Sequence, residues 1–456
     1  MPMPEKAPAF SRTTRIALKL ALVLLVLAVA VYLLVVADLQ RALNSRFDRL
    51  AAIGVPTTWA KAAPPPIPDS ENAAIIYEQA FAELKGLISD TELSDRQALT
   101  HFVSDNPPGN RAKLRSRVLQ ILARNQRAIR LIKEGSARPR CRFSLDWNES
   151  PVEMTFPTFP ALRMSARLLA AEAIIAAERG DGKRVVEDYH VGIRLCAHAA
   201  ETPTLISFLV SVTSQQILLT PLPEVLAQGG LNDADCRALY EDLQRLDFNL
   251  PLREALALHG CEALWCFDAA DRTPDKFREL FGADDQVPRV YLALYSSPLF
   301  KPLRLKEEIA YTELLERELA AAAKPYRESV SERDSLNEEV DRMPGYYVTT
   351  QIVGHVFVRT AASRDRAIAL RNAMQVALAL RAYHVERGQY PDSLAALRKH
   401  PGWELPGDPF SGKPFVYHRQ GAGYLLYSFG PDLDDDGGKP YDNLTQNGDL
   451  VWECRQ

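Results

Sequence analysis

Apolar residues follow three different patterns along this chain, and each pattern predicts a different kind of structure. Near the N-terminus, Leu20 to Ala37 form an unbroken run of eighteen residues without a charge. Through the middle of the chain, apolar residues recur at three- and four-residue spacing, as on one face of an α-helix. Towards the C-terminus they alternate with polar residues over short runs, as in antiparallel strands. We therefore predict a mainly α protein with an N-terminal transmembrane helix and a small α+β module at its C-terminus.

The N-terminal run has the length of a membrane span. As a helix rising roughly 1.5 Å per residue it measures about 27 Å, close to the hydrocarbon thickness of a bilayer. Basic residues flank it on both sides, with Lys6, Arg12, Arg15 and Lys19 before it and Arg41, Arg46 and Arg49 after it. The positive-inside rule then favours an N-terminus inside the cell by a small margin. This predicts a single-pass protein whose C-terminal body lies outside the cytoplasm.

A cleaved signal peptide is the alternative interpretation of the same run. Ala28-Val29-Ala30 offers the small residues that a signal peptidase requires. Cleavage there would leave the apolar segment Val31 to Ala37 at the new N-terminus, which favours an uncleaved signal anchor.

The region after the span predicts a helix and then a spacer. Leu39 to Ala60 has a helical pattern, and the prolines between Ala62 and Pro68 forbid further helix because proline fixes φ and removes a backbone donor. We divide the chain into an N-terminal tail with the anchor (1–37), a juxtamembrane helix with a Pro-rich linker (38–69), a helical domain (70–345) and a C-terminal domain (346–456).

The helical domain consists of successive amphipathic runs. The turn Arg179 to Gly182 ends one helix and begins the next, which resembles one tetratricopeptide-type hairpin, but the chain shows no 34-residue period. We predict an irregular α-solenoid or helical bundle. Thr202 is the expected N-cap of a further helix, with Pro203 at its first position. The charged run Leu303 to Val340 predicts a solvated helical face with i,i+4 ion pairs, and a docking strip is the alternative.

Charge and motifs bear on the class of function. With 54 Lys+Arg and 58 Asp+Glu, the net charge of −4 gives no attraction for nucleic acid. The sequence contains no His-Glu-x-x-His, Gly-x-Ser-x-Gly or Walker-type motif, so catalysis has no positive support. Residues with the spacing of metal sites lack the partners that a metal would need, and we interpret them as structural: Glu187 and His190, and His259 with Cys261 and Cys266. The redox state of the six cysteines stays open.

The C-terminal pattern predicts a helix followed by a small sheet. A long amphipathic helix leads to a turn at Gly388 to Pro391 and then a short helix. Strand-like runs follow, namely Phe415 to His418, Tyr424 to Phe429 and Leu450 to Trp452.

An acidic stretch lies between the second and third of these strands. Asp432, Asp434 and Asp436 alternate before Gly437, as in the opening of calcium-binding loops, where alternate carboxylates converge and glycine permits a sharp bend. Carboxylates this crowded repel one another unless a cation neutralises them. An EF-hand is excluded because the preceding segment alternates like a strand. A solvated acidic turn without an ion is the alternative.

Four motifs in this order resemble a known family: "ALRAYHVERGQYPDSL", "LPGDPFSGKPFVY", "GYLLYSFGPD" and "GDLVW". Together they resemble the C-terminal domain of the major pseudopilin of type II secretion systems, over less than a quarter of the chain. The resemblance implies a long helix packed on a small sheet and a structural calcium ion, held by residues corresponding to Asp432 and Asp449. We thus expect Asp432, Asp434, Asp436 and Asp449 as metal ligands. The family's N-terminal processing site is missing here.

Three functions are compatible with these features. The first is a non-enzymatic single-pass protein of the bacterial inner membrane, with a helical body that binds a protein partner and a calcium-stabilised pseudopilin-like module. The second is a component or client of a type II secretion or pilus-like assembly. The third is an envelope hydrolase whose site carries no recognised motif.

Overall fold

The computed structural model describes residues 12–88, 93–104, 109–228, 230–281, 288–354, 356–397, 402–442 and 444–454. Residues 1–11, the predicted cytoplasmic tail, lie outside them. Within the described residues the chain is mainly helical, with a long apolar helix at the N-terminal end and a three-stranded antiparallel sheet near the C-terminus, which confirms the predicted class. The choice between solenoid and bundle, and the domain boundaries, stay predictions.

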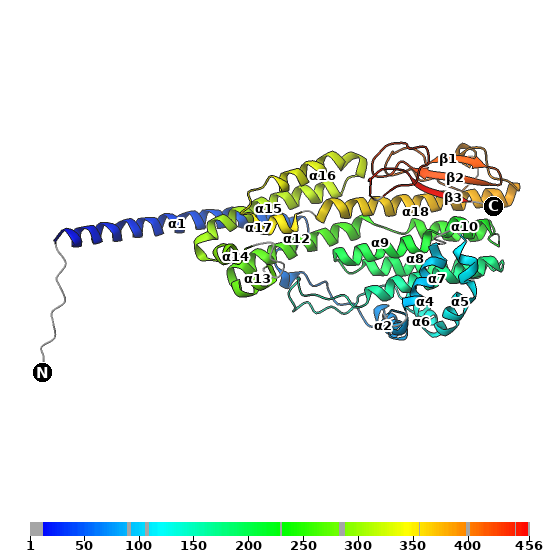
Figure 1. The fold of residues 1–456 in the computed structure, drawn as a ribbon, viewed down its shortest axis with the longest axis horizontal. Helices are drawn as coiled ribbons and strands as arrows, with labels where there is room; N and C mark the ends of the chain where they lie inside the picture. The colour runs from blue at the N-terminus through cyan, green and yellow to red at the C-terminus, as the bar shows by residue number, and fades with distance from the viewer. Residues whose placement is uncertain are drawn as a thin grey trace.

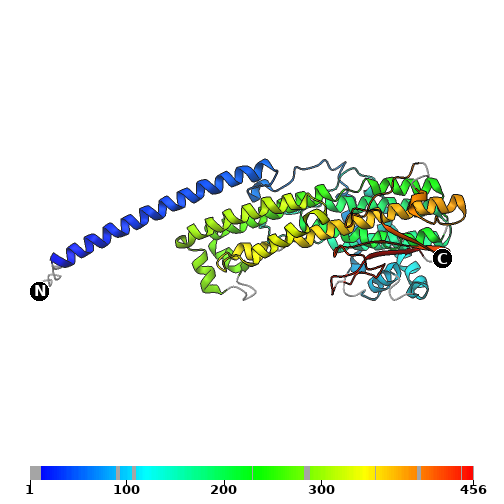
Figure 2. The ribbon, with the colours of Figure 1, turned by 90° about the horizontal axis from the view of Figure 1, so that it is seen from above.

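Helix α1 (Arg12–Ala52) projects from one end of an elongated body (Figures 1 and 2). Its apolar residues from Ile16 onwards qualify as a membrane span, and the most apolar window has no buried residue. A second apolar stretch, Leu205–Ala227, passes the same test of composition but is largely buried in the body, as a core helix would be. The helix ends at Ala52, before the predicted Ala60, because Gly54 adopts a positive φ that terminates it.

The first half of the body contains short and medium helices connected by irregular segments. Their bounds are η1 (Trp59–Lys61), α2 (Ala74–Glu83), α3 (Lys85–Ile88), α4 (Leu93–Ser104), α5 (Asn110–Arg124), α6 (Gln126–Ser136), α7 (Phe159–Glu178), α8 (Gly182–Ala200), α9 (Leu205–Leu219), α10 (Leu222–Ala227) and α11 (Asp233–Gln244). The Pro-rich segment after η1 has no regular secondary structure, as predicted.

The second half begins with long helices and ends in the sheet. Its elements are α12 (Asn249–Arg272), α13 (Pro274–Phe281), α14 (Arg289–Tyr295), η3 (Pro298–Phe300), α15 (Lys301–Ala322), α16 (Tyr326–Asp341), α17 (Val348–Val353), α18 (Val356–Arg387), α19 (Leu394–Leu397), β1 (Val416–Gln420), β2 (Gly423–Ser428) and β3 (Leu450–Cys454). Helices α13 and α14 lie at the end nearest the projecting part of α1, and the sheet lies towards the opposite end (Figure 1).

The hairpin α7–α8 forms as predicted around a glycine turn. Gly180 has a positive φ, and the Asp181 side chain caps α8 by accepting a hydrogen bond from the Arg184 amide. The start of α9 differs from the prediction by two residues, because Thr204 rather than Thr202 is the cap and accepts a hydrogen bond from the Ser207 amide at 3.1 Å. Pro203 therefore precedes the cap.

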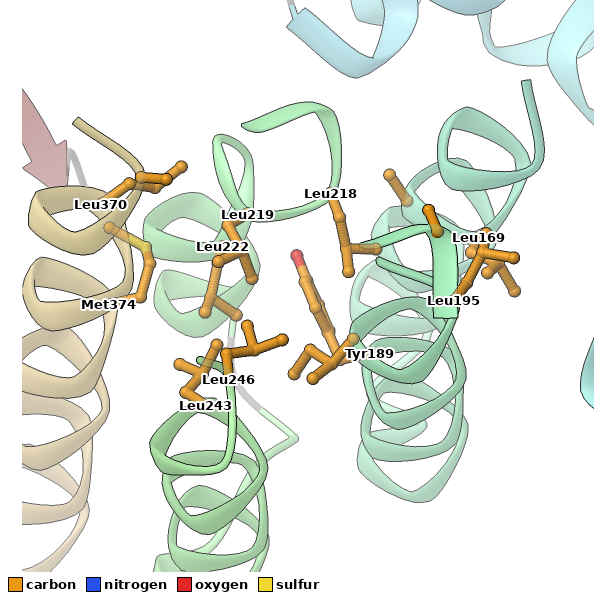
Figure 3. Packing of buried hydrophobic residues seen from close by; sticks show 14 of the residues in the cluster. Leu169, Tyr189, Leu195, Leu218, Leu219, Leu222, Leu243, Leu246, Leu370 and Met374 are labelled. Atoms are coloured by element: carbon orange, nitrogen blue, oxygen red, sulfur yellow. The ribbon is translucent and has the colours of Figure 1, made fainter. Parts of the chain in front are cut away.

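Helix α18 belongs to the same apolar core as the α7–α11 region. Figure 3 shows Leu370 and Met374 of α18 facing Leu222 of α10 and Leu243 of α11, with Tyr189 of α8 beyond them. The core extends from this point to Leu426 of the sheet. The long helix of the C-terminal region is consequently packed into the helical body along much of its length.

The sheet has the strand order β1-β2-β3, with all neighbours antiparallel. The loop before β1 contains the "LPGDPFSG" motif, in which Asp408 is buried. Its carboxylate accepts hydrogen bonds from the amides of Phe410 and Ser411 and, at 2.6 Å, from the hydroxyl of Ser428 at the end of β2. This buried aspartate ties the loop to the sheet and has a structural role.

The charged run in α15 and α16 is only partly solvated, contrary to prediction. Arg304, Glu307 and Glu318 are buried. On α15, Glu313 and Glu316 form ion pairs with Arg46 of α1. One part of α15 thus docks α1, as in the alternative, whereas charged residues of α16 such as Glu338 are exposed, as in the solvated face.

Gly182 provides a test of the packing at the α7–α8 turn. A Cβ added there would overlap the carbonyl oxygen of Gly230, a backbone atom that cannot rotate away. We expect Gly182→Ala to lower the free energy of unfolding by about 1–3 kcal/mol, as overpacked positions do. Gly345→Ala is the matched control, because a Cβ there meets nothing within 4 Å and the backbone has no positive φ. Urea unfolding of the detergent-solubilised chain measures both, and equal losses would contradict the assigned contact.

Candidate functional site

The acidic loop between β2 and β3 is the candidate site. It folds back on itself through backbone hydrogen bonds from the amide of Tyr441 to the carbonyl of Asp449 and from the amide of Asp449 to the carbonyl of Lys439, each 2.8 Å long. Glycines with positive φ, among them Gly437 and Gly438, permit the sharp bends. The segment before the loop is strand β2. An EF-hand loop follows a helix, so the loop is not an EF-hand.

Asp449 is the most buried carboxylate of the loop. Its side chain is fully buried, and Oδ2 accepts a hydrogen bond of 2.7 Å from the Gly438 amide. The other oxygen, Oδ1, is buried without a hydrogen-bond partner among the described residues. Burial raises the pKa of Asp449 to about 6, and the negative charges of Asp435 and Asp436 act in the same direction. Hydrogen bonds from the backbone amides of Gly438 and Asp436 lower this pKa but offset only part of the rise, so an ionised Asp449 is incompletely compensated.

Asp436 contributes a second unpartnered oxygen. Its Oδ2 is also buried without a hydrogen-bond partner among the described residues. A buried acceptor of this kind calls for a water or an ion, and in this loop two of them belong to carboxylates whose charges act on each other. Asp435 lies close enough for its charge to act on Asp449, and its Oδ1 accepts hydrogen bonds from the Tyr427 hydroxyl and the Gly437 amide, both at 3.1 Å.

Asp432 and Asp434 are turned towards backbone amides. Asp432 accepts a hydrogen bond of 2.6 Å from the Gly448 amide and another of 3.3 Å from the Asp434 amide. The exposed Asp434 accepts a hydrogen bond of 2.9 Å from the Asp435 amide. Asp432 thereby fixes the backbone that presents Asp449, whereas Asp434 stabilises a local turn.

The structure therefore brings the four expected ligands together only in part. Asp436 and Asp449 offer free oxygens, while Asp432 and Asp434 are occupied by the backbone. Within the described residues, no group of three or more His, Cys, Asp or Glu side chains is arranged to hold a metal ion. Carboxylate oxygens are the ligand type that a hard cation such as calcium takes, and a cation at this loop would need further ligands from backbone carbonyls or water. Asp435, which the alternating pattern omits, is a residue that sequence reasoning missed.

The other residues with metal-like spacing have different partners. His190 Nδ1 lies 2.8 Å from an oxygen of Asp242, and His259 Nδ1 lies 3.0 Å from an oxygen of Glu262. All six cysteines are free and buried. Burial raises the pKa of the Cys261 thiol to about 12, as it does for Cys196, Cys236 and Cys266. These thiols are inert structural residues.

A cluster of charged side chains on α6, α7 and α8 is one of several buried polar centres in the helical region. Lys133 Nζ lies 2.5 Å from Asp188, and Arg184 forms two hydrogen bonds of 3.0 Å with Glu172. Burial raises the pKa of Asp188 to about 7, and the negative charge of Glu172 acts in the same direction. Lys133 and Arg184 offset these carboxylates, and the cluster thereby cross-links three helices.

Comparison of the chain with protein-family models, with curated proteins and with solved structures gives no match.

The raised pKa of Asp449 predicts a pH dependence in the absence of divalent cations. The folded state binds this proton more tightly than the unfolded state, so with a chelator the stability of the loop should fall as pH rises from about 4 to about 6 and stay constant above that. The rise from the ordinary value of 3.8 to about 6 corresponds to at most about 3 kcal/mol. Hydrogen exchange of the 430–442 peptide at several pH values, corrected for intrinsic rates, measures this change.

Asp449→Asn should abolish the pH dependence, because a neutral amide resembles the protonated acid. The exposed Asp442→Asn is the matched control and should retain it. Identical profiles in the wild-type chain and Asp449→Asn would show that this carboxyl group does not titrate as described.

Proposed function

We propose that the chain is a non-enzymatic single-pass membrane protein of the bacterial envelope. In this proposal its helical body binds a protein partner outside the cytoplasm, and its C-terminal loop is braced by a calcium ion. The observation that carries the proposal is the continuity of α1, which runs without a break from the apolar segment into the body. A helix that spans lipid at one end and packs on the body at the other holds the body in a fixed orientation on the membrane.

The packing of α1 supports this rigid mounting. Leu43 and Leu50 of α1 are buried. The helix of the body that packs on α1 is α15. Arg46 forms ion pairs with Glu313 and Glu316, and Arg49 Nε lies 3.2 Å from Glu316. A body that moved freely relative to α1 would need a flexible linker between α1 and the helix on which it packs. The Pro-rich segment instead comes after the junction, so it cannot uncouple α1 from α15.

The junction is testable by a charge-exchange cycle. Arg46→Glu and Glu313→Arg each place like charges in contact and should speed hydrogen exchange in α15. The double variant Arg46→Glu/Glu313→Arg should recover most of the lost protection against hydrogen exchange. The coupling energy should be about 0.5–1 kcal/mol, as for a half-exposed pair. Recovery stays incomplete because Glu316 then lies beside the carboxylate introduced at position 46. If the effects of the single changes simply add, the pair does not hold the junction.

The two unpartnered oxygens in the C-terminal loop support the calcium part of the proposal. Asp436 Oδ2 and Asp449 Oδ1 are buried acceptors, and a divalent cation would satisfy both while neutralising the charge that Asp435 adds. Loops of this kind outside the cytoplasm bind calcium with a Kd of about 10⁻⁴ to 10⁻³ M. In this proposal the ion has a structural role, which is to neutralise the charge of the loop.

Calcium should slow hydrogen exchange in the 430–442 peptide of the full-length chain. Calorimetric titration with calcium should give a Kd of about 10⁻⁴ to 10⁻³ M. Asp436→Asn/Asp449→Asn should abolish both effects, because it removes the free carboxylate oxygens. Asp442→Asn is the control and should behave like the wild-type chain. An unchanged peptide in saturating calcium would leave the loop as a solvated acidic turn.

A role in a type II secretion or pilus-like assembly is the second candidate, favoured by the C-terminal arrangement. The pseudopilin resemblance implies a long helix packed on a small sheet, with a calcium-binding loop between the final strands. This chain has a long helix, a small antiparallel sheet and an acidic loop before the last strand. Helix α18 is, however, covered by α9 and α11. We therefore propose docking to such an assembly and not polymerisation into it, and co-purification with secretion-system subunits distinguishes this role from the first.

A further inference from the structure

A turn in the body lies beside the apolar part of α1. The turn comprises α14, η3 and the first residues of α15, and we name it the tip. The hydroxyl of Tyr32 on α1 donates a hydrogen bond to the carbonyl of Pro298 in η3. Tyr32 comes five residues before Ala37, the end of the uncharged run, which is about 7.5 Å along a helix. The tip of the body therefore lies beside the last residues of the apolar run and not only beyond its end.

The partly buried residues of α1 confirm this overlap. Tyr32 and Val36 are partly shielded, whereas the preceding residues of the run are exposed on all sides. Tyrosine is also a residue that concentrates at membrane interfaces, where its ring is apolar and its hydroxyl is hydrated. Tyr32 therefore marks the depth at which the tip meets the lipid boundary.

The tip presents apolar side chains that nothing in the described structure covers. Val290 and Leu299 are each 74% exposed, Leu294 is 45% exposed and Leu303 is 37% exposed. They come from three consecutive elements at the end of the body from which α1 projects (Figures 1 and 2). Large exposed apolar groups clustered in this way mark a binding surface or a membrane contact.

The tip is held rigidly, so this exposure is a property of the fold. The buried Arg304 donates hydrogen bonds to the carbonyls of Tyr295 and Ser297 and forms an ion pair with Asp271 of α12. Lys301 Nζ also lies 2.8 Å from Asp271. Lys301 and Arg304 are thereby held against Asp271 of α12, while the leucine and valine side chains of the tip stay exposed.

We propose that the tip inserts into the boundary between lipid headgroups and acyl chains, in the leaflet from which α1 emerges. Val290, Leu294, Leu299 and Leu303 are its lipid contacts. This inference rests on the proposed membrane span of α1. It adds a second membrane contact, which fixes the tilt and rotation of the body on the bilayer in a way that one helix cannot. We assign lipid as the partner of this apolar surface because the tip is hydrogen-bonded to α1 within its apolar run, and lipid surrounds that run in the proposed span.

Spin labels on the full-length chain test this depth. The chain is reconstituted into phosphatidylcholine–phosphatidylglycerol vesicles with a nitroxide at Leu299→Cys or Val290→Cys. Accessibility to oxygen, which partitions into lipid, is compared with accessibility to a water-soluble nickel chelate. Leu25→Cys in the span is the lipid reference, and Leu444→Cys, at a residue 94% exposed in the C-terminal loop, is the aqueous reference. Wild-type chain treated with the label gives the background, because its cysteines are buried.

Labels at residues 299 and 290 should be more accessible to oxygen than to the nickel chelate, as expected for groups buried about 5–10 Å into the boundary between headgroups and acyl chains. Aqueous values at both positions, with a lipid value at residue 25, would overturn the insertion and leave the anchor intact. An aqueous value at residue 25 would overturn the anchor itself. Immobilised labels shielded from both reagents would show that a protein surface or a second copy covers the tip, which also overturns the lipid contact.

Discussion

The contact between α1 and α15 is the constraint on which the placement of the rest depends. It combines buried leucines with the Arg46–Glu313 and Arg46–Glu316 ion pairs, so that apolar burial provides the affinity and the charges fix the register. Because α15 also packs on α12 and α16, the orientation of α1 is transmitted to the whole body. The tip and the sheet then lie near opposite ends of one elongated molecule (Figure 1).

Buried carboxylates recur through the structure, and the charges that surround them differ. In the cluster around Asp188, and where Arg333 of α16 lies 3.6 Å from Asp365 of α18, each buried carboxylate has a cationic partner. Such pairs cross-link helices and cost much to break, since breaking one leaves a charge in a medium of low dielectric constant. Asp449 differs because its neighbours are acidic. That contrast distinguishes the acidic loop from the structural ion pairs and makes it the candidate cation site.

The candidate site was partly predictable from the sequence. The alternation of Asp432, Asp434 and Asp436 before a glycine identified the loop, and the motif "GDLVW" identified Asp449. The alternation could not show that Asp434 is exposed, nor that Asp435 faces Tyr427 and influences Asp449. Loop side chains take their directions from turns and positive φ values that short spacing does not encode, and the strand pairing that brings residue 449 next to residue 438 is non-local.

By itself, the sequence determined the apolar helix, the α7–α8 hairpin and the three strands, because each depends on the periodicity of neighbouring residues or on a glycine turn. Tertiary structure alone decided that the charged face of α15 receives α1, that α18 joins the core of the helical body, and that the apolar tip lies beside Tyr32. These contacts join residues that are tens to hundreds of positions apart. A local pattern shows which face of a helix is apolar or charged, but only the folded chain determines what covers that face.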